Sequence, residues 1–155
     1  AGWRALGDAR GEAEVLHATG VMNRDLGRLD EAQTLLGQAA SVSARLGDAY
    51  ALATTENDLG ILRAYQQDDE GARRHFRRSL ELKREVQDAQ GVAYALGNLG
   101  AVTEDPAEQF ALYDESLAIK RTLGDVQGVA VTAFNCARAA RAAGRTWRAG
   151  TCQSR

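Results

Sequence analysis

Apolar residues recur every three or four positions along most of the chain. The clearest sets are Leu16, Thr19, Met22 and Leu26, then Ala72, Phe76, Leu80 and Val86, then Val92, Leu96, Leu99 and Val102. This spacing places the side chains on one face of an α-helix. Glycine and polar residues interrupt the pattern at regular intervals, so the sequence predicts a series of short amphipathic helices.

The interruptions set the boundaries of these helices. Asp105-Pro106-Ala107-Glu108 is typical of a helix start, because an acidic N-cap precedes proline at the first helical position and glutamate follows three residues after the cap. We expect first helices at roughly residues 10–26, 49–66, 89–103 and 126–143, and second helices at roughly 30–45, 69–86 and 106–122.

The helices belong to a repeat of forty or slightly fewer residues. Three registers show it: the triplets Leu6-Gly7-Asp8, Leu46-Gly47-Asp48, Val86-Gln87-Asp88 and Leu123-Gly124-Asp125; the glycines Gly20, Gly60 and Gly100; and the pairs Ala32 with Leu36 and Ala72 with Phe76. The sequence therefore predicts three full repeats over 9–48, 49–88 and 89–125. Residues 1–8 and 126–155 are expected to be partial repeats, which suggests a fragment of a longer protein.

The three glycines of the second register lie inside predicted helices. Glycine in a helix costs up to about 1 kcal/mol relative to alanine. A recurring cost implies a recurring geometry, and the simplest is close approach of the two helices of one hairpin. We expect the second-helix residues Leu36, Phe76 and Tyr113 to fill the layer beside these glycines.

This pattern resembles the tetratricopeptide repeat, in which a large residue, Leu-Gly and an aromatic mark the first helix, and small and aromatic residues mark the second. The strings ENDLG at 56–60 and ALGNLG at 95–100 resemble the subclass found in kinesin light chains, Pins-type adaptors and large bacterial regulators. The resemblance implies an all-α, right-handed α-α superhelix, or solenoid, as a single array over 1–155.

The sequence departs from the family pattern at a few positions. Asn23, Arg63 and Thr103 stand where the family has an aromatic residue, and Gln109 stands where a small residue is expected. The third repeat is also three residues shorter in its inner loop. We expect these changes to alter packing without changing the fold.

Composition and charge agree with an all-α chain and narrow the range of partners. The chain of 155 residues has one proline, 45% hydrophobic residues and a net charge of -2. Residues 1–125 carry -7 and residues 126–155 carry +5. This net charge does not favour nucleic acid or a membrane as partner. The arginines between Arg73 and Arg84 do not favour them either, because glutamates lie at helical pairing distance from several of these arginines.

Motifs for catalysis and cofactors are missing from the sequence. It has no phosphate-binding loop, no H-E-x-x-H and no nucleophile elbow, so we expect no enzyme and no cofactor. Cys136, Cys152, His17 and His75 have no zinc or haem spacing, so we expect no metal site. Two scattered cysteines favour a reduced, cytoplasmic setting.

In the tetratricopeptide family, the first helices usually line a concave binding groove. The repeat register assigns thirteen residues to this face, which we call the groove residues: Glu14, His17, Thr54, Asn57, Ile61, Tyr65, Tyr94, Asn98, Ala101, Phe134, Asn135, Arg138 and Arg141. Asparagine can bond an extended peptide backbone, apolar side chains can form pockets, and arginine can bind a carboxylate. Some of these residues could instead pack between repeats.

Two functional hypotheses follow from the family resemblance. The first is a scaffold that binds a protein or peptide partner, as a sensing or regulatory part of a larger bacterial signalling protein. Its bacterial source is suggested by many arginines beside only two lysines. The alternative is a structural segment that associates with other copies, or with other domains of its own chain, through uncapped ends.

Overall fold

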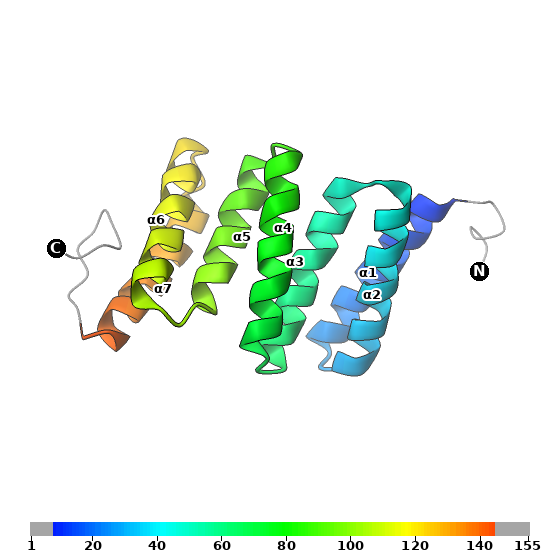
Figure 1. Cartoon of the computed structure of the whole chain (residues 1–155), viewed down its shortest axis with the longest axis horizontal. Coiled ribbons are helices and arrows are strands. Elements are labelled where there is room, and N and C mark those ends of the chain that lie inside the picture. Colours follow the sequence, from blue (N-terminus) through cyan, green and yellow to red (C-terminus); the bar gives the residue numbers. More distant parts are fainter. Residues whose placement is uncertain (1–7, 145–155) are drawn as a thin grey trace. The chain divides into compact units, whose positions relative to one another are not determined.

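The computed structural model describes residues 8–144, which form seven α-helices and no strand (Figure 1). Every predicted boundary lies within two residues of the observed one, which confirms the all-α prediction. The helices are α1 (Ala9–Asp25), α2 (Leu29–Leu46), α3 (Ala49–Tyr65), α4 (Asp69–Glu85), α5 (Ala89–Ala101), α6 (Pro106–Thr122) and α7 (Val126–Ala142).

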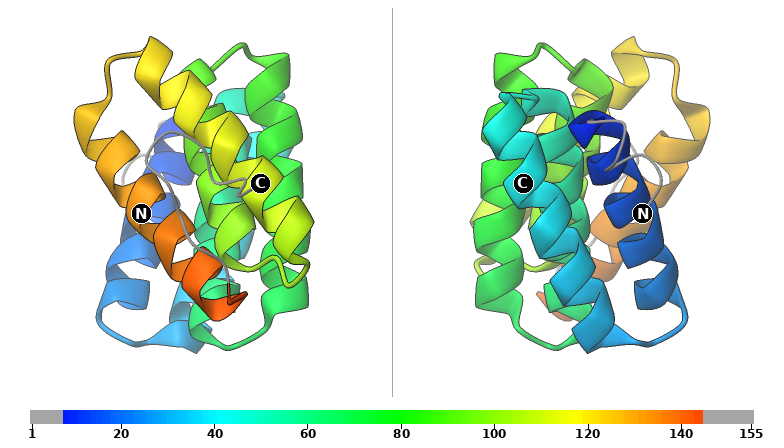
Figure 2. Two further views of the ribbon diagram at one scale, coloured as in Figure 1. Left: turned by 90° about the vertical axis from the view of Figure 1, so that its left-hand side faces the viewer. Right: turned by 90° about the vertical axis from the view of Figure 1, so that its right-hand side faces the viewer.

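The helices fall into two compact units, Ala1–Val86 and Gln87–Arg155. In the first unit α1 packs on α2, α3 packs on α4, and α2 also packs on α3; in the second unit α6 packs on both α5 and α7. Figure 2 shows α1 beside α2 in one view and α6 beside α7 in the other. Within each unit, consecutive helices run antiparallel. One continuous right-handed array across both units remains a prediction.

An aspartate caps the N-terminus of every first helix, which explains the repeated Gly-Asp signal. In each case the carboxylate accepts a hydrogen bond from the backbone N–H three residues later, at 2.8–3.0 Å; the four caps are Asp8, Asp48, Asp88 and Asp125. The residue before the caps Asp48, Asp88 and Asp125 has left-handed backbone geometry where glycine is favoured, for example φ +67° at Gly47 and +71° at Gly124. The triplet therefore encodes the end of one helix and the cap of the next.

The mid-helix glycines lie where the two helices of a hairpin touch. A Cβ on Gly60 would lie 2.5 Å from the ring of Phe76, and a Cβ on Gly100 would lie 2.8 Å from the ring of Tyr113. Gly20 meets the Leu36 side chain in the same way. Real Cβ atoms do not come so close to other atoms, so the predicted close approach is confirmed.

Each unit has its own apolar core. The core of the first unit includes Ala32, Leu36, Leu59 and Leu62, and the core of the second includes Phe110, Tyr113, Leu117, Cys136 and Ala140. Cys136 is fully buried and is disulfide-bonded, with its partner outside the described residues. The expectation of a reduced cysteine is therefore wrong for this structure.

At three of the four positions that depart from the family pattern, the polar side chain donates a hydrogen bond to a nearby helical carbonyl. The Asn23 amide donates to the Thr19 carbonyl at 2.9 Å, and the Thr103 hydroxyl donates to the Leu99 carbonyl at 2.7 Å. The Gln109 amide donates to the carbonyls of Gly100 and Thr103. The shortened repeat thus ends α5 early, and Gln109 satisfies the carbonyls at that end.

Candidate partner-binding surface

The groove residues are all accessible to some degree. Seven are exposed: Glu14, Tyr65, Tyr94, Ala101, Phe134, Arg138 and Arg141. Six are half-buried: His17, Thr54, Asn57, Ile61, Asn98 and Asn135. All thirteen come from the first helices α1, α3, α5 and α7, while the buried residues of those helices lie at other positions of the repeat. Within each unit these side chains are therefore available for contact with a partner.

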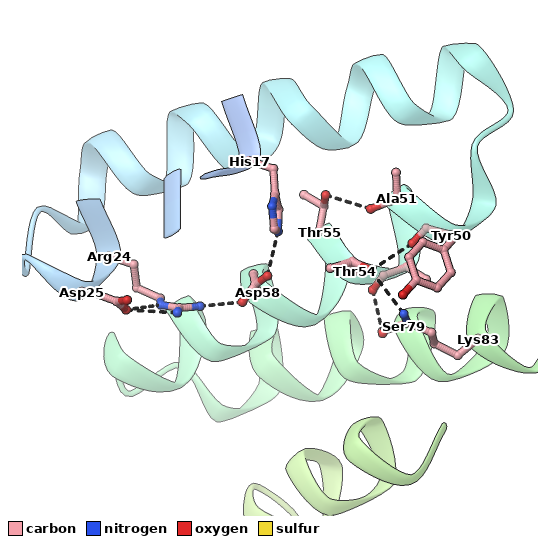
Figure 3. A network of polar contacts seen from close by, with 11 residues as sticks. His17, Arg24, Asp25, Tyr50, Ala51, Thr54, Thr55, Asp58, Ser79 and Lys83 are labelled. Carbon is pink, nitrogen blue, oxygen red and sulfur yellow. Dashed lines mark hydrogen bonds and ion pairs between the residues drawn. The ribbon is translucent and has the colours of Figure 1, made fainter. Parts of the chain in front are cut away.

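Three polar side chains join α1 to α3 at the centre of the first unit (Figure 3). The Asp58 carboxylate lies 2.8 Å from His17 Nε2 and accepts a bond from Arg24 Nη1 at 2.6 Å. Arg24 Nε also donates to the Asp25 carboxylate at 3.0 Å. His17 is one of the groove residues, yet its ring nitrogen, like the Arg24 guanidinium, bonds a side chain of α3. We call these three residues, His17, Arg24 and Asp58, the Asp58 cluster.

The surroundings of Asp58 and Arg24 favour the charged states of these two side chains. Burial raises the pKa of Asp58, but the bonds from His17 and Arg24 outweigh it, and the net pKa is below that of an ordinary carboxyl. Burial lowers the pKa of Arg24, and the carboxylates of Asp58 and Asp25 reverse that effect, so its pKa is raised. The cluster is a charged link between two neighbouring repeats.

Sequence reasoning overlooked Asp58, although the register contains the signal. Asp58 lies 40 residues before Asn98, and Asn135 lies 37 residues after Asn98, matching the spacing of the last repeats. The three residues thus share one repeat position, with a carboxylate or an amide each time. Treating Asp58 as an equivalent of Asn98 would have placed a polar residue on that face of α3.

Beside this cluster, α1, the end of α2 and the start of α3 enclose a pocket of about 340 Å³. Ala13, Leu46 and Ala51 form apolar walls, and the polar lining includes Glu14, His17, Ser43, Tyr50, Thr54 and Thr55. This volume lies at the small end of the range for ligand sites, about 300 to 1,000 Å³. We call it the Ser43 pocket. It brings together Glu14, His17 and Thr54 of the groove residues.

A second, more open hollow of about 560 Å³ lies on α7. Its lining includes the groove residues Phe134, Arg138 and Arg141 together with Ala137. Phe134 is 70% exposed, which is unusual for so large an apolar side chain. An aromatic surface flanked by two arginines suits an apolar side chain next to a carboxylate.

Residues 11–85 match the model of the tetratricopeptide repeat family. This part of the chain belongs to that family. A solved structure with the same fold is that of BtubC (BKLC) from P. vanneervenii, with a TM-score of 0.80 and 23% sequence identity. The match covers 88% of this chain and 58% of BtubC, so the chain spans little more than half of that protein's length. No curated protein matches the chain.

Tetratricopeptide repeats generally form protein-binding modules and are typically not catalytic. Residues 8–144 contain no cluster of histidine, cysteine, aspartate or glutamate side chains suited to a metal ion. Within the same residues, no helix is both long enough and apolar enough to cross a membrane.

The two lysines of the chain occupy the same position in successive tetratricopeptide hairpins, and both are buried. Lys83 Nζ bonds the Thr54 hydroxyl at 3.2 Å and lies 4.2 Å from the centre of the Tyr50 ring. Lys120 Nζ bonds the Thr132 hydroxyl at 2.7 Å and lies 4.8 Å from the ring of Tyr94. Burial lowers the pKa of Lys120, and the nearby Asp125 opposes that shift.

These contacts correct the interpretation of the basic stretch on α4. Arg73 pairs with Glu70 at 2.7 Å and Arg78 pairs with Glu81 at 3.2 Å, as the helical spacing predicts. Lys83, however, is only 7% exposed and points to α3. It belongs to the hairpin interior, so the basic stretch is shorter than the sequence suggests.

Proposed function

We propose that the chain is a non-catalytic scaffold that binds a protein or peptide partner through the groove residues. The observation that carries the proposal is that none of the thirteen is buried, although the helices bearing them supply buried core residues at other positions. A mixture of amide, aromatic and cationic groups suits a peptide, whose backbone needs donors and acceptors and whose side chains need pockets.

The test compares groove variants with a matched variant on a second helix. We expect the pair Phe134→Ala and Arg138→Ala to reduce capture of a partner from the source organism's lysate, by about 2 to 4 kcal/mol in binding free energy. Asn57→Ala with Ile61→Ala tests the first unit in the same way. Gln38→Ala, on the exposed side of α2, is the control.

The readout must separate binding from folding. Exposed substitutions usually change stability by less than about 0.5 kcal/mol each, so urea unfolding of the Phe134→Ala, Arg138→Ala variant should match that of the parent chain. Asn57 and Ile61 are half-buried, so capture by their variant is compared at a urea-free condition where unfolding shows the variant to be fully folded. Unchanged capture together with lost stability would show that these residues pack the repeats, and the binding surface would then have to lie elsewhere.

A second candidate function, self-association, is favoured by the outer face of α1. Met22 is 55% exposed and Val15 is 53% exposed, while their repeat equivalents Leu62 and Thr55 in α3 are buried. The equivalent face of α3 is covered by the preceding hairpin. Sedimentation velocity over a hundredfold range of concentration tests this alternative: association that Met22→Glu abolishes would support it.

We also propose that the module regulates a larger bacterial signalling protein in the cytoplasm. The regulatory role rests on the resemblance of ENDLG and ALGNLG to arrays in such regulators. Thiol trapping tests the cytoplasmic setting: cells are quenched with acid and the protein is alkylated under denaturing conditions, because Cys136 is fully buried in the folded chain. A cytoplasmic protein would be labelled at both cysteines.

A further inference from the structure

One repeat position differs between the first hairpin and the next two. Counting by the repeat, Ser43 on α2 corresponds to Lys83 on α4 and to Lys120 on α6. The two lysines are 7% and 4% exposed. A lysine side chain therefore fills the interior of the second and third hairpins, and the first hairpin has only a hydroxymethyl group at that place.

The Ser43 pocket is the space that the missing lysine would fill. Lys120 Nζ lies 4.8 Å from the centre of the Tyr94 ring and 2.7 Å from the Thr132 hydroxyl. It would lie 3.7 Å from a Cβ atom added to Gly97. The repeat equivalents of these three residues, listed in the same order, are Glu14, Thr55 and His17. All three line the Ser43 pocket, as does Ser43 itself.

The pocket also has the chemistry to receive an ammonium group. Glu14 has no ion pair or hydrogen bond within residues 8–144, and it replaces the neutral Thr54 and Tyr94 of the later hairpins. Arg10, the one arginine in the lining, is paired with Asp48 at 3.4 Å, which offsets its charge. Ser43 is 1% exposed and lines the pocket, so its hydroxyl is a buried polar group at the site.

We propose that the Ser43 pocket binds a lysine side chain of the partner protein. The partner's lysine would take the place that Lys83 and Lys120 occupy in their own hairpins. Its methylenes would lie against Ala13, Leu46 and Ala51, and its ammonium group would meet the Glu14 carboxylate and the hydroxyls of Ser43 and Thr55. This proposal deepens the proposed function and depends on it, because it names one side chain that the scaffold recognises.

The experiment is an NMR titration of the whole chain with Nα-acetyl-lysine N-methylamide. We expect saturable shifts of the backbone amides of Ser43, Ala51 and Thr55, with a dissociation constant on the order of millimolar, as suits so small a ligand. The uncharged norleucine analogue should bind at least about tenfold more weakly, because it lacks the charge-assisted bonds. The glutamate analogue should not bind.

Two variants test the mechanism. Glu14→Gln should weaken binding of the lysine probe several-fold and leave the norleucine analogue unaffected. Ser43→Lys should fill the pocket from within, so the lysine probe should no longer bind, and the melting temperature should stay the same or rise. The matched control is Ser79→Lys: Ser79 is fully buried and donates to the Ala53 carbonyl at 2.7 Å, so a lysine there should lower the melting temperature strongly.

Several results would overturn the proposal. Equal affinity for the lysine and norleucine probes, or tighter binding of the glutamate probe, would show that the pocket does not select an ammonium group. An equal loss of stability in Ser43→Lys and Ser79→Lys would show that the pocket is not a vacant lysine position. None of these results affects the capture experiment on Phe134, Arg138, Asn57 and Ile61, so failure of this inference can be told from failure of the proposed function.

Discussion

The hairpin of α3 and α4 and the hairpin of α5 and α6 close their turns by different means. In the first, Gln67 adopts a left-handed φ of +60° and Asp68 caps α4 by accepting a bond from the backbone N–H of Gly71. In the second, α5 ends early, Asp105 caps α6, and the Gln109 side chain reaches back to the end of α5.

The centres of the same two hairpins are nearly identical. Ser79 donates to the Ala53 carbonyl and Ser116 donates to the Ala93 carbonyl, both at 2.7 Å. Each hairpin also has a glycine facing an aromatic ring and a lysine beside a tyrosine. The comparison indicates that the centre defines the repeat, while the turn tolerates deletion wherever another group satisfies the exposed carbonyls.

The largest expected effect is at the central glycines. Gly60→Leu and Gly100→Leu should each cost about 1 to 3 kcal/mol of unfolding free energy, because the new side chain overlaps a buried ring that cannot move away. Gly60→Leu should be the worse of the two, since its Cβ would lie 2.5 Å from Phe76, against 2.8 Å from Tyr113 for Gly100. Urea titration measures both.

Gly97→Ala is the matched control for this prediction. Gly97 lies one turn before Gly100 in α5, and its Cβ would meet Lys120 and Ser116 at an ordinary 3.7 Å. Alanine is favoured over glycine in a helix by up to about 1 kcal/mol, so this variant should be neutral or more stable. A similar loss of unfolding free energy in Gly97→Ala and Gly100→Leu would contradict the conclusion that close packing at the centre of the hairpin defines the repeat.

The next effect concerns the position at which α3 has Asp58 and α5 has Asn98. Asp58→Asn gives α3 the amide that α5 has at this position. It also removes the carboxylate charge that His17 and Arg24 contact, so it should lower the free energy of unfolding by about 2 kcal/mol at pH 7. Because folding lowers the pKa of Asp58, its contribution is complete well above the unfolded carboxyl pKa of about 4 and is lost as the pH falls below that value.

The measurement is urea unfolding of Asp58→Asn and the parent chain at pH 7 and at pH 3. The difference in stability between the two should shrink at the lower pH. Asp69→Asn is the control, since Asp69 is an exposed carboxylate in the first turn of α4. If the Asp58→Asn difference stayed constant with pH, the charge would not be the source of the effect.

A smaller effect is expected at the altered turn. Gln109→Ala restores the small residue that Ala72 provides in the neighbouring hairpin, yet we expect it to cost about 1 kcal/mol. The reason is that the carbonyls of Gly100 and Thr103 would lose the Gln109 amide donor. Gln90→Ala, at an exposed position of α5, should cost little. A gain in stability from Gln109→Ala would show that the shortened turn needs no such donor.

The sequence predicted the fold well and the polar contacts poorly, for a physical reason. Helix starts, glycines and caps follow local rules, so the register alone placed Gly60 against Phe76. The bonds of Asp58 and the burial of Lys83 depend on which helix lies opposite, and neither residue type is expected inside a protein. Aligning Lys83 with Lys120 by the repeat would have indicated a structural role, since a surface lysine has no reason to recur.

The smallest expected effect is at the turn of the hairpin of α3 and α4. Gln67 corresponds to Gly27 in the hairpin of α1 and α2, and both have positive φ, +60° and +76°. A side chain in this conformation costs about 1 to 2 kcal/mol, and glycine avoids that cost while losing more backbone entropy on folding. Gln67→Gly should therefore raise stability by about 0.5 kcal/mol, and Gly27→Gln should lower it by a similar amount. Both side chains would be exposed, so no packing change obscures the comparison. Thermal unfolding should show shifts in opposite directions; a gain in Gly27→Gln would mean that the turn geometry is not what limits this hairpin.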